Sequence, residues 1–254
     1  MVAFDVADLG ERREYGMARA ERLSSTWERH AWVAGILFVI ALVAEGAVAI
    51  GVGVNQDDSA AKIANALRDH QQRLHLIAYL SVICAAMFVV YLNGLYNLLR
   101  ADTGRARVVS ALVLIGGTLL VALHGVSDIG ITGLLGAKLA TFGAQQDQGV
   151  SYTLYLLVFA FESVGDVFGS VFAIATGVLV MSSRLLPRWL GWVAIAFGVL
   201  FFIQGFGLGG VIATFGLVVD GIGFVLFLIF VLASSVIMLT RGSAVPASGQ
   251  QPAR

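Results

Sequence analysis

The sequence predicts an all-α, polytopic membrane protein that crosses the bilayer with six helices. Its 254 residues are 58% hydrophobic and only 13% charged, and the mean hydropathy is +0.87. A soluble domain carries about 25% charged residues, so this composition indicates a membrane protein. Six apolar stretches of about 20–30 residues are each long enough to cross a hydrocarbon core of about 30 Å. Basic residues are concentrated in alternate connections, as expected for a multi-pass chain.

The chain divides into three predicted parts. Residues 1–30 are rich in charged side chains and form a polar cytoplasmic segment, expected to be a short helix or partly disordered. Residues 31–240 form the transmembrane domain. Residues 241–254, rich in Gly, Ser, Ala and Pro, form a disordered cytoplasmic tail. The predicted spans are residues 31–54, 74–99, 108–131, 152–181, 189–210 and 215–239.

Two connections are long enough to carry structure of their own. Residues 58–71 have the pattern of a short polar helix, for which Asp58 or Ser59 is a suitable N-cap. Residues 137–151 are polar and are predicted to be a loop. The apolar piece 129–139 contains three glycines, which is compatible either with an extension of span 3 or with a re-entrant turn.

The distribution of Lys and Arg predicts the orientation of the chain. Five lie in the N-terminal segment, three in the 100–107 connection, two in the 182–188 connection and two in the tail. The opposite side holds the remaining four of the 16. Cytoplasmic connections carry an excess of Lys and Arg, so both termini are predicted to be cytoplasmic.

Span 4 carries a stripe of small and polar residues on one helical face. Its members recur at steps of three and one, as a single face requires: Glu162, Gly165, Asp166, Gly169, Ser170, Ala173, Thr176 and Gly177. Small residues let neighbouring helices approach closely, so this face is predicted to point into the bundle. The bulky residues are predicted to face lipid: Leu156, Phe159, Val164, Val167, Phe168, Val171, Phe172 and Ile174.

Acidic residues at membrane depth are the strongest functional signal. They occur in spans 1, 3, 4 and 6, with one histidine four residues before the acid of span 3, and the candidate binding residues are Glu45, His124, Asp128, Glu162, Asp166 and Asp220. A carboxylate inside a membrane is costly and marks a functional-site candidate. No Lys or Arg lies within a span interior. We therefore expect an acidic pocket that opens outward, with Glu45, Glu162 and Asp166 at its floor.

Such a pocket has three chemical uses. Some of the acids are expected to be protonated, because low dielectric disfavours their charged form, and they can then relay protons. The pocket can bind an organic cation. It can also bind a divalent metal ion as a cofactor, through His124, Asp128, Glu162 and Asp166. The alternative is purely structural: each protonated acid donates to a backbone carbonyl, or to Ser127, Ser163 or Ser170, and holds the bundle together.

Other motifs limit the function further. Two glycine series recur every seven residues in spans 5 and 6, namely Gly191, Gly198, Gly205 and Gly209, Gly216, Gly223. They predict packing seams, which can also serve a second copy or a partner in a membrane complex.

Residues 205–210 match G-x-G-x-x-G, but no strand precedes them, so a dinucleotide site is not supported. The single cysteine, Cys84, cannot form a disulfide within the chain and is interpreted as a small hydrophobe. No basic block indicates nucleic acid.

One short segment supports a resemblance to a known family. Residues 182–199 contain a Ser…Leu-Pro-Arg-x-Leu-Gly pattern built from Ser183, Leu186, Pro187, Arg188, Leu190 and Gly191. This segment, together with the first outer loop from Asp57, resembles a large group of uncharacterised bacterial six-span membrane proteins. The resemblance implies six helices in a bacterial cytoplasmic membrane. It implies no settled activity, so no catalytic residue is carried over.

Three functions remain open from the sequence. The first is a binding or transport protein for a proton, a metal or a small cationic or neutral solute. The second is a non-enzymatic accessory or assembly subunit of a membrane complex. The third is a metal-dependent intramembrane hydrolase. No P-loop, G-x-S-x-G or H-E-x-x-H motif occurs, so the sequence favours a function other than catalysis.

Overall fold

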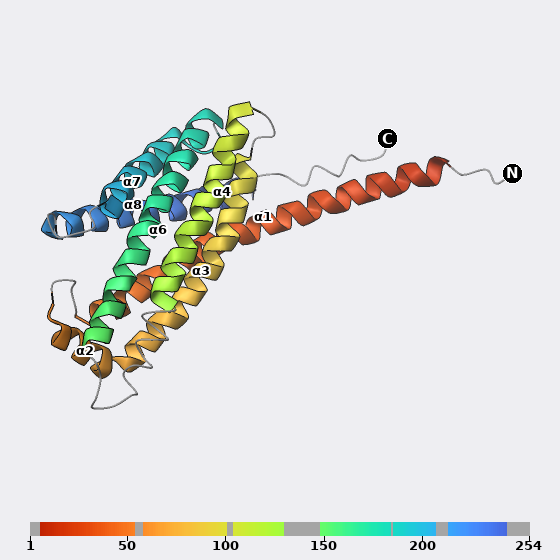
Figure 1. The fold of residues 1–254 in the computed structure, drawn as a ribbon. Coiled ribbons are helices and arrows are strands. Elements are labelled where there is room, and N and C mark those ends of the chain that lie inside the picture. The colour runs from red at the N-terminus through yellow and green to blue at the C-terminus, as the bar shows by residue number, and fades with distance from the viewer. Residues whose placement is uncertain are drawn as a thin grey trace.

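The fold is an all-helical bundle, seen in a computed structural model of the chain (Figure 1). The structure describes residues 6–53, 58–100, 104–129, 148–183, 185–206 and 213–242. A π-helical turn at residues 126–129 continues α4, and no strand occurs among the described residues. The helices are α1 (Val6–Ile50), α2 (Ala60–Asp69), α3 (Gln71–Leu99), α4 (Gly104–Gly125), α6 (Gln148–Ser183), α7 (Arg188–Phe206) and α8 (Ala213–Gly242).

Six of these helices are long and apolar enough to cross a membrane, which confirms the predicted fold class. They are α1, α3, α4, α6, α7 and α8. The predicted polar helix before span 2 is α2, and Ser59 is its N-cap, accepting a hydrogen bond from the Lys62 backbone N–H at 3.3 Å. The predicted re-entrant piece, most of the 137–151 loop and most of the tail lie outside the described residues.

The first helix is longer than the first predicted span. Its backbone runs without a break through 45 residues, so the polar segment and span 1 belong to one element. Figure 1 shows the N-terminal part of α1 projecting away from the bundle, while its C-terminal part packs among the other helices. The polar segment is thus helical from Val6 onward, but as part of a long helix and not as a short separate one.

Helix α6 occupies the centre of the bundle. It packs against α4 on one side and α7 on the other, while α1 packs against α3 and α8. Figure 1 shows the upper part of α6 running between α4 and α7, while its lower part extends toward α2. Short α2 packs against α6 and α3 at the end of the bundle where α1 finishes. This arrangement determines which neighbours surround the two acids of α6.

The stripe of small and polar residues on α6 is buried, as predicted. Asp166 is 4% exposed, and Ala173 and Thr176 are fully buried, whereas Leu156 and Val164 on the other face are exposed. Of the residues assigned to the lipid-facing set, Leu156, Val164 and Ile174 are exposed, whereas Phe159, Val167, Phe168 and Val171 are partly buried. Phe172 is completely buried, so its prediction was wrong. The physical reason is that helices cover α6 on more than one side, which leaves only a narrow strip of its surface for lipid.

The predicted glycine seam of span 5 lies at the contact between α7 and α6. A Cβ on Gly198 would lie 2.9 Å from the Ala173 Cβ, and one on Gly205 would lie 2.8 Å from the Ser163 carbonyl oxygen. Gly191 and Gly177 bring the two backbones together at the other end of this contact. These glycines are therefore engaged within the chain, and their use by a partner stays a prediction. In span 6, Gly223 packs near Phe201, and Gly209 lies outside the described residues.

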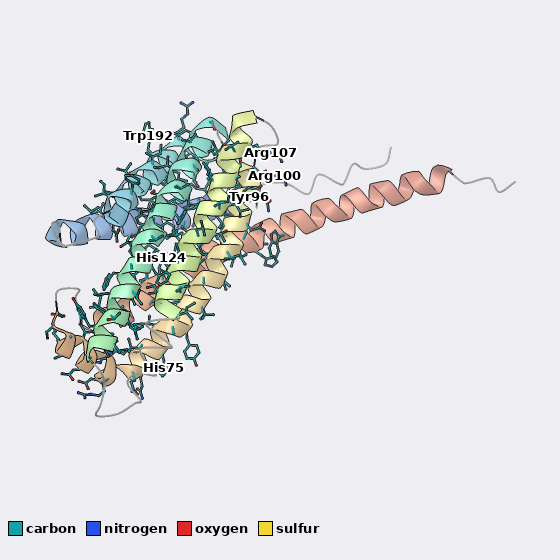
Figure 2. The ribbon with its side chains drawn as sticks, in the orientation of Figure 1. His75, Tyr96, Arg100, Arg107, His124 and Trp192 are labelled. Atoms are coloured by element: carbon teal, nitrogen blue, oxygen red, sulfur yellow. The ribbon has the colours of Figure 1, made fainter. Side chains whose placement is uncertain are left out.

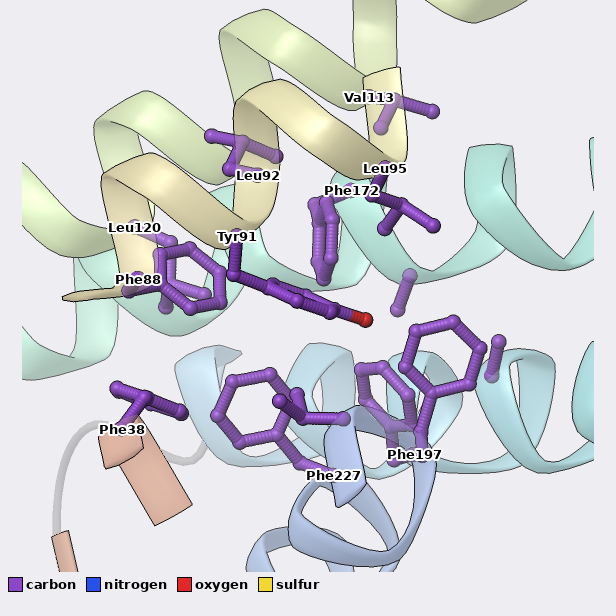
Figure 3. Close-up of a cluster of buried hydrophobic side chains, with 14 of the residues drawn as sticks. Phe38, Phe88, Tyr91, Leu92, Leu95, Val113, Leu120, Phe172, Phe197 and Phe227 are labelled. Atoms are coloured by element: carbon purple, nitrogen blue, oxygen red, sulfur yellow. The ribbon is translucent and has the colours of Figure 1, made fainter. Parts of the chain in front are cut away.

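Aromatic side chains fill the core where α1, α3, α6, α7 and α8 converge (Figure 3). The Phe88 ring lies 5.1 Å from the Phe38 ring and 5.9 Å from the Phe172 ring, between ring centroids. The Phe197 ring meets the Phe227 ring at 5.5 Å in an edge-on arrangement. Edge-on and tilted contacts are the favoured geometries of aromatic pairs. This core ends at a cavity on one side.

Gly177→Ala and Gly221→Ala are expected to change stability in opposite directions. A Cβ at residue 177 would lie 2.7 Å from the Gly191 carbonyl oxygen, whereas one at residue 221 meets nothing within 4 Å. Overpacking costs about 1–3 kcal/mol. Replacing an unhindered helical glycine with alanine gains about 0.5–1 kcal/mol. The free energy of unfolding in detergent micelles measures both, and equal effects at the two positions would contradict the described α6–α7 contact.

Candidate functional site

The described helices enclose a cavity of about 120 Å³. Residues of α1, α3, α4, α7 and α8 line it, together with Asp128 of the π-helical turn. Figure 2 places His124, one of the lining residues, about midway between the end of the bundle with Trp192 and Arg107 and the end with His75. The cavity therefore lies inside the spans. Its polar lining consists of Glu45, Ser81, Cys84, His124 and Asp128.

Glu45 of α1 is the most enclosed acid of the cavity lining. It is only 7% exposed. The Ser81 hydroxyl donates to its Oε1, and the Cys84 thiol donates to its Oε2 across 3.4 Å. Both partners lie on α3, three residues apart, so one face of α3 presents two donors to one carboxyl group. A buried carboxylate needs such partners, because leaving it without hydrogen bonds costs several kcal/mol.

His124 of α4 connects the cavity to α6. Its Nδ1 lies 3.0 Å from the Leu120 carbonyl oxygen, and its Nε2 lies 3.6 Å from Asp166 Oδ1. A carbonyl only accepts, so Nδ1 carries a hydrogen and donates it. In the neutral ring Nε2 is then an acceptor. An attractive contact with Asp166 therefore requires a further proton, held either by the ring or by the carboxyl group. At 3.6 Å the two atoms lie beyond hydrogen-bond distance, so His124 and Asp166 attract each other as a pair only while such a proton is present.

Gly165 makes the position of His124 sterically available. A Cβ on residue 165 would lie 2.6 Å from His124 Nδ1 and 2.7 Å from Cε1. The imidazole thus lies directly against the α6 backbone, beside Asp166. Gly165 and Asp166 are consecutive residues of the predicted stripe, and one provides the space for the ring while the other provides its polar contact.

The π-helical turn after α4 directs two adjacent residues to different partners. Ser127, fully buried, donates to Glu162 Oε1 at 3.0 Å, whereas Asp128 lines the cavity. Single π-helical turns at the end of an α-helix often occur at functional sites. Asp128 is also close enough to Glu45 and Glu162 for its carboxyl group to interact with theirs. Asp128 thus interacts electrostatically with one acid of span 1 and with one acid of span 4.

The structure separates the predicted site into two layers. Glu45, His124 and Asp128 line the cavity, but Glu162 and Asp166 do not, although both were expected at its floor. They lie behind it, on α6, against residues of α4 and its π-helical turn. The side chain of Asp220 lies outside the described part of the structure. Within the described residues, no three His, Cys, Asp or Glu side chains converge closely enough to hold a metal ion. The four-ligand metal site stays a prediction.

Sequence reasoning missed three features of the cavity. Ser81 and Cys84 were not assigned to it, although their spacing of three residues places them on one helical face. The aromatic wall was also missed. It consists of five phenylalanines from four helices: Phe38, Phe88, Phe201, Phe224 and Phe227. Phenylalanine is absent from span 3, occurs once each in spans 1 and 2, and occurs four times each in spans 4, 5 and 6. Nothing in this distribution shows which of the rings meet at one cavity.

The contact between His124 and Gly165 can be tested with a double-mutant cycle. Gly165→Ala is expected to destabilise the protein by about 1–3 kcal/mol, because the new methyl group overlaps the imidazole. In a His124→Ala background the same change is expected to cost nothing, since the next nearest atom is the Leu123 Cβ at 3.5 Å. Unfolding free energies in detergent give the coupling. An equal cost in both backgrounds would mean that the ring does not lie over residue 165.

Comparison with known proteins gives a family but no activity. No curated protein and no solved structure shows significant similarity to the chain. A family model described as a domain of unknown function, DUF4386, matches residues 33–240, which include all six spans. This agrees with the expected membership in an uncharacterised membrane family, whereas the Ser183-to-Gly191 pattern itself is not tested by the match. The chain therefore belongs to the DUF4386 family.

Proposed function

We propose that this protein binds a small, positively charged solute in the intramembrane cavity and transports it across the membrane. The observation that carries this proposal is the placement of Glu45, Asp128 and His124 around one cavity at mid-depth in the bundle. Acidic side chains inside a membrane mark pathways for substrates, ions or protons. We also propose the orientation with both termini in the cytoplasm, and a bacterial cytoplasmic membrane as the location, from the distribution of Lys and Arg and from the family resemblance.

The charge of the cavity supports a cation rather than an anion. Among the described residues that line the cavity, two carry carboxyl groups and none is Lys or Arg. Glu162 lies close behind, near enough to interact with Asp128. An anion entering this space would meet repulsion in a low-dielectric environment, where charge interactions are stronger than in water. A cation would relieve the mutual repulsion of the acids.

The second layer supports a link between the solute and protons. His124 lines the cavity with one edge and contacts Asp166 with the other. A cation beside His124 disfavours a charged imidazole, so binding would shift the proton of this contact toward Asp166 or release it. The α4–α6 contact would then report the occupancy of the cavity. This coupling belongs to the proposal and is one reason to favour transport over simple binding.

The accessory-subunit alternative assigns the same residues a structural role. In that case the Ser81, Cys84 and Ser127 contacts simply satisfy buried carboxyl groups, and the cavity never admits a solute. The hydrolase alternative requires a water-activating cluster, and no such cluster occurs among the described side chains. Two measurements therefore decide between the transport function and the accessory-subunit function: whether solutes enter the cavity, and whether the cavity prefers cations.

Cys84 provides a natural probe of that access, since it lines the cavity and is the only cysteine of the chain. We expect a trimethylammonium-bearing methanethiosulfonate to label the folded protein at least about tenfold faster than its sulfonate counterpart, a preference of about 1.4 kcal/mol. Each rate is first divided by the rate with a free thiol. Both reagents react with the same thiolate, so the ratio of the normalised rates reports the cavity and not the reactivity of the thiol. Glu45→Gln should reduce the ratio.

Cys84→Ser is the control for labelling elsewhere and should remove all signal. Equal normalised rates for the two reagents would reject charge selection. If Cys84 reacts only after denaturation, even with the smaller neutral methyl methanethiosulfonate, the cavity is closed to solutes, and the structural role of the acids is the correct one. Mass spectrometry of the intact protein measures each rate without a functional assay.

A further inference from the structure

We propose that the ligand of the cavity is a small alkylated ammonium ion, held between an aromatic wall and Glu45. This inference rests on the proposed function and adds the chemical class of the ligand. Five of the lining residues are phenylalanines, contributed by α1, α3, α7 and α8. Glu45 and Asp128 are the acidic groups that line the same space. Aromatic rings combined with carboxylates form the kind of site that recognises quaternary ammonium groups.

The rings form one continuous surface rather than scattered contacts. Phe227 is at its centre, with ring centroids 5.8 Å from Phe38, 5.9 Å from Phe88 and 6.0 Å from Phe201. Each of these pairs is edge-on or tilted, so neighbouring rings lie at steep angles to one another. Rings inclined in this way present both edges and faces around a cavity. The face of an aromatic ring is electronegative and attracts a cation within about 6 Å.

The hydrogen-bonding groups of the cavity exclude other ligand classes. Among the described lining residues, the Ser81 hydroxyl lies within hydrogen-bond distance of Glu45 Oε1 and of the Ile77 carbonyl oxygen, and the Cys84 thiol is directed at Glu45. The Nδ1 donor of His124 is directed at Leu120. The carboxyl groups are acceptors when ionised. A sugar, an amide or an anion needs donors from the protein, whereas an alkylated ammonium needs only negative charge and apolar contact.

The apolar wall also disfavours small hydrated cations. Metal ions and sodium must exchange water for several oxygen or nitrogen ligands when they enter a protein site. In the described part of the cavity most lining side chains are apolar, and no cluster of three ligating groups is present. An alkylated ammonium is weakly hydrated and carries its own apolar surface. Its methyl groups can contact the phenylalanines while its charge faces Glu45.

The volume of the cavity sets the size of the ligand. The cavity measures about 120 Å³. An engineered apolar cavity of roughly 150 Å³ in another protein admits benzene. A ligand of about the bulk of benzene is therefore the upper limit, and tetramethylammonium, with four methyl groups around one nitrogen, is close to that limit. Larger ammonium compounds would have to displace side chains of the wall.

The test measures protection of Cys84 in the full-length wild-type protein. A neutral methyl methanethiosulfonate labels the thiol while tetramethylammonium, ammonium or tert-butanol is added at constant ionic strength. Ammonium has the charge without the methyl groups, and tert-butanol has nearly the shape without the charge. We expect tetramethylammonium to protect at concentrations at least about tenfold lower than either control, since it alone combines both interactions.

Substitution of one ring tests the aromatic contribution. Phe224→Leu is expected to raise the half-protecting concentration of tetramethylammonium by about three- to thirtyfold, the range given by one cation–π contact. Phe224 lines the cavity but is only partly buried, so its loss should leave the fold intact. Phe202→Leu is the matched control: Phe202 is 49% exposed and does not line the cavity. Phe202→Leu should change the half-protecting concentration of tetramethylammonium by less than about twofold.

Failure of this inference and failure of the proposed function give different results. If charged reagents distinguish the cavity but ammonium protects as well as tetramethylammonium, the cavity selects cations and the ligand class is wrong. Equal protection by tert-butanol would make the site merely apolar. No protection by tetramethylammonium would also overturn the inference. If the charged reagents label Cys84 at equal normalised rates, the proposed function fails and the ligand class fails with it.

Discussion

The close approach of α6 to both of its neighbours is the constraint on which the rest of the bundle depends. On the α4 side, a Cβ at Gly116 would lie 2.7 Å from the Phe172 backbone nitrogen. On the α7 side, Gly177 lies against the Gly191 carbonyl group. In a membrane, lipid tails are as apolar as the helices, so association relies on such backbone contact and on interhelical hydrogen bonds. Larger residues at these glycine positions would separate the helices. The polar groups that the helices bring together would then also move apart.

This packing explains why the polar groups form two layers. Asp166 lies at the α4–α6 contact, so it meets His124 rather than the cavity, and Glu162 meets Ser127 in the same way. The cavity forms beside this contact, where residues of α1, α3, α4, α7 and α8 meet and large aromatic rings replace the small residues. His124 belongs to both regions. A change in the charge of the cavity can thus reach α6 through a single imidazole.

The electrostatics of the bundle distinguish a working site from a structural one. Ser81, Cys84 and Ser127 donate to Glu45 and Glu162, which lowers the cost of burying these carboxyl groups. They add no positive charge, so the mutual repulsion of the acids remains. A proton or a bound cation is the remaining way to neutralise it. The aromatic wall makes a bound cation favourable in a place where water is scarce, and this is the physical basis of the proposed function.

The sequence by itself determined the number, the approximate limits and the helical character of the six spans, because apolar length and period are local properties of the chain. It also determined the buried face of α6 and the identity of the membrane-depth acids. Only the tertiary structure decided that Phe172 is core, that Glu162 and Asp166 lie behind the cavity, and that Ser81 and Cys84 face Glu45. These facts depend on which helices are neighbours and on how each is rotated. Helix rotation in a bundle follows from contacts between distant segments, and a single sequence does not reveal them.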